Sequence, residues 1–128
     1  VPSSAPASAP DRANVQLNAL LVSKGAPEKV LQVVDAHLDA FNTVNQITAL
    51  HRLATLLGQA TRKASVRRDA RFKRLVQRLS ETLRKAEDGA LKPRDLSNAA
   101  WALTKLGIWN GLLFGHLSQR IARTIGDF

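Results

Sequence analysis

The segment Asn45-Gln-Ile-Thr-Ala-Leu-His-Arg-Leu-Ala54 recurs as Asn98-Ala-Ala-Trp-Ala-Leu-Thr-Lys-Leu-Gly107, with Asn, Ala and two Leu residues at matching positions. Apolar residues three and four positions apart are typical of an amphipathic α-helix. A second segment, Phe72-Lys-Arg-Leu-Val-Gln-Arg-Leu79, recurs as Phe114-Gly-His-Leu-Ser-Gln-Arg-Ile121. Two helices per repeat predict stacked helical hairpins, because each hairpin buries its apolar face only against its neighbours.

Outward from these segments, the same spacing predicts six helices bounded by Gly, Pro and capping residues. They cover about residues 12–24, 27–41, 44–57, 69–85, 94–106 and 110–125. Asp11 and Asn110 are the expected N-caps of the first and last helix. No stretch alternates apolar and polar residues with period two, so no sheet is expected. The predicted fold class is all-α, a short α-solenoid of about three hairpins at 11–42, 43–88 and 92–128.

Two segments lie outside this helical pattern. The spacing between the repeated segments differs between the copies, which indicates an insertion in the first copy, in a loop from Gly58 to Arg68. Residues 1–10 consist of Pro, Ser, Ala and one Val without a charged side chain. Such a composition cannot bury enough apolar surface to fold alone. We therefore expect a flexible N-terminal arm at 1–10 and a helical-repeat domain at 11–128.

The composition excludes several classes of protein. A chain of 128 residues is the length of one domain. It contains no Cys, which excludes disulfide scaffolds, cysteine-based zinc sites and thiol catalysis. Its apolar runs are far shorter than the ~20 residues of a transmembrane helix. The chain begins with Val1 and contains no Met, so we expect a mature form from which a targeting leader has been removed.

The positive charge is concentrated in one part of the chain. The net charge is +9, and between Arg62 and Lys85 stand ten basic and two acidic residues. At about 100° per residue, the helix predicted at 69–85 carries an apolar stripe and a cationic row on different sides. The apolar stripe consists of Phe72, Leu75, Val76, Leu79 and Leu83, and the cationic row of Arg67, Arg71, Arg74, Arg78 and Lys85.

A row of like charges destabilises a folded chain unless an anion neutralises it, so this row predicts an anionic partner such as RNA. Arginine grips phosphate oxygens in pairs, and lysine adds less specific attraction. The candidate phosphate contacts are Arg62, Lys63, Arg67, Arg68, Arg71, Lys73, Arg74, Arg78 and Lys85. The alternative is a solvated helix face, which normally carries interleaved acidic residues; here only Asp69 and Glu81 interrupt the row.

A second set of candidates lies on the first helices of the two clear repeats. Amide, aromatic and cationic side chains there suit the base edges, base faces and phosphates of single-stranded RNA. The candidate base contacts are Asn45, Arg52, Asn98, Trp101 and Lys105. The alternatives are that the two Asn residues cap or bridge helices, and that Trp101 and Trp109 are packing residues.

Nothing in the sequence indicates catalysis. His37, His51 and His116 stand one per predicted helix, without a second ligand at metal-binding spacing. There is no nucleophile elbow, phosphate-cradling Gly-rich loop or HExxH motif, and the one acidic pair, Glu87-Asp88, falls in a predicted loop. We expect neither an enzyme nor a bound metal or cofactor.

The segments 41–54 and 95–107, above all Leu96-Ser-Asn-Ala-Ala-Trp-Ala-Leu103, resemble the octotricopeptide and RAP-associated helical-repeat proteins of algal, dinoflagellate and apicomplexan organelles. The resemblance covers about two thirds of the chain, from Phe41 onward. It implies an α-solenoid that acts on RNA or in a ribosome inside a mitochondrion or chloroplast. Base-by-base reading of RNA takes many repeats, whereas about two and a half are present here.

Two functional hypotheses follow. The first is a non-catalytic organellar RNA-binding helical-repeat protein that contacts the RNA backbone through its basic helix. The alternative is an accessory structural subunit of a large organellar complex, a ribosome or a photosynthetic or respiratory assembly. In that case the basic row meets an acidic protein or lipid surface.

Overall fold

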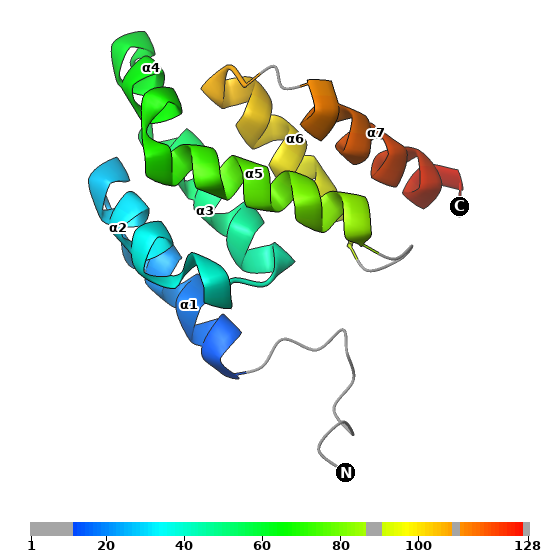
Figure 1. Cartoon of the computed structure of the whole chain (residues 1–128), viewed down its shortest axis with the longest axis horizontal. Coiled ribbons are helices and arrows are strands. Elements are labelled where there is room, and N and C mark those ends of the chain that lie inside the picture. The colour runs from blue at the N-terminus through cyan, green and yellow to red at the C-terminus, as the bar shows by residue number, and fades with distance from the viewer. Residues whose placement is uncertain (1–11, 87–90, 109–110, 127–128) are drawn as a thin grey trace.

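The computed structural model describes residues 12–86, 91–108 and 111–126, and within these ranges every element is helical (Figure 1). The elements are α1 (Arg12–Ser23), α2 (Pro27–His37), the 3₁₀ turn η2 (Leu38–Ala40), α3 (Thr43–Leu56), α4 (Ala60–Arg68), α5 (Ala70–Lys85), α6 (Pro93–Leu106) and α7 (Gly111–Gly126). The prediction of an all-α protein is confirmed. The prediction of six helices is wrong, because the described part of the chain forms seven.

The helices form two layers (Figure 1). In one layer α3 packs between α1 and α6, and in the other α5 packs between α2 and α7. The layers contact each other through α2 with α3, α3 with α5 and α6 with α7. The two copies of each repeated sequence segment are therefore neighbours in space, α3 beside α6 and α5 beside α7.

α5 is the predicted basic helix, and it is strongly amphipathic. Asp69 caps its N-terminus, since the carboxylate accepts a hydrogen bond of 2.8 Å from the backbone N–H of Arg71. The buried side of the helix consists of Phe72, Leu75, Val76, Leu79, Ser80 and Leu83, which contains the whole predicted apolar stripe. Burial of each large apolar side chain contributes about 1.5–3 kcal/mol, and this face holds α5 between its neighbours.

α4 is the helix that the sequence reading missed. The predicted loop from Gly58 to Arg68 contains a helix over Ala60–Arg68, so the described part of the predicted hairpin 43–88 holds three helices and is not a simple hairpin. Val66 is its one buried residue. Because the helix lacks an apolar stripe, periodicity cannot reveal it, although Ala, Arg and Lys all favour helix formation.

The other helix ends follow local sequence signals. The Asn42 side chain caps α3 and forms a capping box with Asn45, while Pro93 begins α6. Gly107 ends α6 in the left-handed conformation, at φ 72°. The predicted arm at 1–10 and the predicted caps Asp11 and Asn110 lie outside the described residues.

Candidate nucleic-acid interface

The predicted cationic row on α5 is largely paired within the molecule. Arg74 Nη2 lies 2.8 Å from Asp35 Oδ1 of α2, and Arg78 Nη2 lies 2.9 Å from Asp39 Oδ1 of the η2 turn. Both ion pairs are well exposed to solvent. The expectation that only Asp69 and Glu81 interrupt the row is therefore wrong, because α2 and η2 supply further carboxylates along it.

Arg71 is the most firmly held residue of the row. Its guanidinium donates to both carboxylate oxygens of Glu28, each at 2.9 Å, and to both oxygens of Asp69, at 2.8 and 3.0 Å. Hydrogen bonds from Arg71 lower the pKa of Asp69 to about 2 and also lower the pKa of Glu28. The same bonds raise the pKa of Arg71. Arg71 thus joins α2 to the start of α5 and has little capacity left for a phosphate.

Two other arginines cap the C-terminal ends of helices. Arg52 Nε donates to the Lys24 carbonyl oxygen just after α1, at 2.9 Å, and Arg67 Nη1 donates to the Leu106 carbonyl oxygen at the end of α6, at 2.7 Å. The last carbonyl groups of a helix have no partner within the helix and carry partial negative charge, which a guanidinium satisfies. Arg52 and Arg67 therefore have structural partners.

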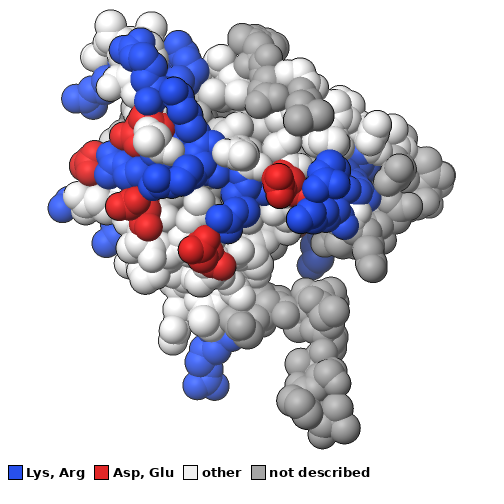
Figure 2. All heavy atoms as spheres, viewed as in Figure 1, with Lys and Arg blue, Asp and Glu red and all other residues white. Residues whose placement is uncertain are grey.

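Four of the predicted phosphate contacts form neither an ion pair nor a side-chain hydrogen bond with any described residue. They are Arg62, Lys63, Arg68 and Lys73. In Figure 2 the basic side chains gather over α4 and continue along α5, where acidic side chains are interspersed. Lys85 contacts Glu81 of the same helix at 3.8 Å, which is a weak pair. Unbalanced positive charge is thus greatest on α4, at the junction with α5.

Asn45, a candidate base contact, lies in the interior. It is 1% exposed, and its Oδ1 accepts hydrogen bonds from Asn14 Nδ2 at 2.8 Å and the Asn42 backbone N–H at 3.1 Å. Its Nδ2 donates to the Asn14 carbonyl at 2.9 Å and to Asn18 Oδ1 at 3.2 Å. The amide bridges α1 and α3 and is not accessible to a base.

The candidates on α6 remain accessible. Trp101 is 44% exposed, and its ring packs in a tilted arrangement against that of His51 on α3, with centroids 4.9 Å apart at an interplanar angle of 40°. Lys105 is exposed, and Asn98 is half-buried. Exposed tryptophan is a suitable surface for base stacking, and three of the five candidates, all on α6, are accessible to solvent.

The structure adds a groove along α5 that no sequence motif revealed. It has a volume of about 400 Å³ and lies where α5 faces the end of α6. Its lining residues are Arg67, Phe72, Lys73, Val76, Gln77, Ser80, Glu81 and Ile108. Helical spacing places the α5 members on one side of that helix, but the contribution of Ile108 depends on tertiary packing.

Comparisons of the chain with family models, curated proteins and solved structures give no match. Each helix in the described ranges is too short or too polar to span a bilayer. Within the same ranges, His, Asp and Glu side chains do not gather in threes as metal ligands would. A functional proposal therefore depends on the charges and grooves described above.

Proposed function

We propose that this protein is a non-catalytic, organellar RNA-binding protein that grips the RNA backbone mainly through α4. The observation that carries the proposal is that Arg62, Lys63 and Arg68 share one short helix without a carboxylate partner among the described residues. Lys73 of α5 extends this group. Uncompensated cations attract phosphate and release counterions on binding, which favours association with a nucleic acid.

The arrangement of the helices supports a helical-repeat protein. Side-by-side packing of α3 with α6 and of α5 with α7 is what an α-solenoid requires of its repeats. The resemblance of 41–54 and 95–107 to octotricopeptide-type proteins supports an organellar location and RNA as the ligand. The organellar location and RNA as the ligand are both part of this proposal.

The proposed contact surface differs from the row on α5 that the sequence suggests. Arg71 is saturated by carboxylates, and Arg74 and Arg78 each share their charge with an aspartate. Phosphate groups must compete with those carboxylates on α5, whereas on α4 no such competition exists in the described structure. We therefore assign the main phosphate contacts to α4 and a secondary role to Arg74 and Arg78.

Binding of a short single-stranded RNA, followed by fluorescence anisotropy at several salt concentrations, tests the proposal. Contacts to about three phosphates give a slope near −2 for log affinity against log salt. The double variant Arg62→Glu, Arg68→Glu should reduce affinity at least tenfold. The matched control is Lys92→Glu, Arg94→Glu, which makes the same charge change at exposed positions at the N-terminal end of α6, where Lys92 is the N-cap residue. Equal losses in both variants, or no binding by the unmodified protein, would contradict the proposal.

A scaffold role in a large organellar complex is the second candidate. One observation favours it: Val15, Val22 and Val44 are exposed around a shallow groove of about 510 Å³ between α1 and α3. Exposed apolar patches often mark protein–protein contacts. If Val15→Ser with Val22→Ser releases the protein from an organellar assembly that Arg62→Glu with Arg68→Glu leaves intact, the scaffold role is the correct one.

A further inference from the structure

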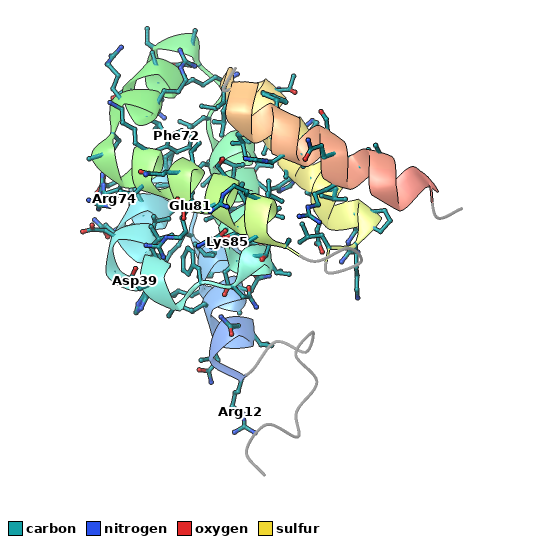
Figure 3. All side chains as sticks on the ribbon, turned by 45° about the vertical axis from the view of Figure 1, so that its right-hand side comes forward. Arg12, Asp39, Phe72, Arg74, Glu81 and Lys85 are labelled. Atoms are coloured by element: carbon teal, nitrogen blue, oxygen red, sulfur yellow. The ribbon has the colours of Figure 1, made fainter. Side chains whose placement is uncertain are left out.

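The groove along α5 lies directly beside the cations of α4. Arg67, from α4, and Lys73 stand at the N-terminal end of the groove, and Glu81 stands at the other end. Lys73 and Glu81 belong to the same helix, so a rise of about 1.5 Å per residue separates their Cα atoms by roughly 12 Å. In Figure 3 the labels of Arg74, Glu81 and Lys85 follow one another along α5.

The lining of the groove combines an apolar floor with polar edges. Phe72 and Val76 are buried and Ile108 is half-buried, which provides a surface for a flat, weakly polar ring. The Gln77 amide and the Ser80 hydroxyl supply hydrogen-bonding groups along the groove. An apolar slot with few polar groups and opposite charges at its ends suits a ligand that is itself anionic at one end and a hydrogen-bond donor at the other.

We propose that this groove binds one unpaired base of the RNA strand whose backbone contacts α4. The phosphate of that nucleotide lies toward Lys73, and the base carries an exocyclic amino group that donates to Glu81. The inference rests on the proposed RNA binding and goes beyond it, since it assigns a base-selective subsite on α5 to a protein whose main proposed RNA contacts are to the backbone.

Glu81 is the residue that makes the groove selective. Its closest ion-pair partner in the described structure is Lys85 at 3.8 Å, so its carboxylate oxygens remain available as acceptors. A carboxylate repels the phosphate backbone but accepts well from the amino group of cytosine. Uracil presents a carbonyl oxygen at the corresponding position and is disfavoured. Single-stranded bases are commonly read in this way, through the edge that would otherwise pair.

The Glu81→Gln variant tests the subsite, because base binding and backbone electrostatics predict changes in RNA affinity of opposite direction. If the protein contacts only the RNA backbone, removal of a negative charge beside the basic surface strengthens the binding of every oligonucleotide. The subsite predicts instead about tenfold weaker binding of oligocytidylate. Binding of oligouridylate and of an abasic oligonucleotide of equal length should be unchanged or tighter. Tighter binding of all three probes would overturn the proposal.

A second variant blocks the groove without a change of charge. Gln77 is exposed on the groove edge, so Gln77→Trp covers the apolar floor, and Gln119→Trp on α7 is the matched exposed control. Gln77→Trp should remove the preference for oligocytidylate over the abasic probe, while the control retains it. Equal affinity of the unmodified protein for these two probes overturns the subsite but leaves backbone binding intact. Absence of binding to every probe overturns both proposals.

Discussion

Arg67 Nη1 of α4 donates a hydrogen bond of 2.7 Å to the carbonyl oxygen of Leu106, the last residue of α6. The helix that interrupts the first repeat therefore caps a helix of the next one. The following residue, Gly107, has φ 72°, and a Cβ atom there would lie 3.1 Å from Arg67 Nη1. The left-handed turn and the arginine cap thus both depend on the absence of a side chain at position 107.

Replacement of Gly107 tests this dependence. Gly107→Ala should destabilise the fold by about 1–2 kcal/mol, because an L-residue is strained at positive φ and the methyl group crowds the guanidinium. Gly115→Ala is the control: it lies within α7 with open space around its Cβ position and should stabilise by about 0.5–1 kcal/mol. Urea unfolding followed by circular dichroism measures both. Equal effects would contradict the proposed strain.

The contacts of Arg71 predict a specific loss of stability in acid. The pKa of Asp69 in the folded protein is lowered from 3.8 to about 2, and that of Glu28 is also lowered. A lowered folded-state pKa stabilises the protein above the unfolded-state pKa, and this contribution disappears as the pH falls through the folded-state value. Stability should therefore decline between about pH 4 and pH 2.

Thermal unfolding of the Arg71→Gln variant over the same pH range measures the contribution of these contacts. The variant should be less stable than the unmodified protein at pH 6, and the difference should shrink toward pH 2. Arg84→Gln is a suitable control, since Arg84 is exposed on the same helix and forms no ion pair with a described residue. A constant difference across the pH range would show that Arg71 acts by packing alone.

The aspartates opposite α5 should compete with RNA for Arg74 and Arg78. These two pairs are exposed, so Asp35→Asn with Asp39→Asn should change the unfolding free energy by no more than about 0.5–1 kcal/mol. RNA affinity should rise several-fold, because both guanidiniums become available for phosphate. In an Arg74→Gln, Arg78→Gln background the gain should vanish. A gain that persists there reflects net charge and contradicts the competition.

The all-α class and most of the individual helices could be predicted from the sequence because most helices bury an apolar stripe. The stripe through Phe72 and Leu79 predicted α5 to within a residue of its observed start, whereas α4 has one buried residue and left no such signal. The ion pairs between α2 and α5 could not be predicted from the sequence. Arg74 and Asp35 are far apart in the chain and meet only because α2 packs against α5. The available indication was that Asp35 and Asp39 are four residues apart, as are their partners Arg74 and Arg78.

The two asparagines at matching positions of the repeats should behave differently. Asn45→Ala removes the side-chain acceptor of the Asn42 N–H, one of the acceptors of Asn14 Nδ2 and the donor to the Asn14 carbonyl oxygen, so we expect a loss of about 1–3 kcal/mol in unfolding free energy. RNA affinity of the folded fraction should not change.

Asn98 is half-buried and has no hydrogen-bond partner among the described residues, so Asn98→Ala should cost little stability. If Asn98 contacts a base, this variant should instead weaken RNA binding by about fivefold or more, in line with the 1–3 kcal/mol of a base-edge contact. Urea unfolding and anisotropy on the same preparations separate these effects, and a large stability loss in Asn98→Ala would assign both asparagines to helix packing.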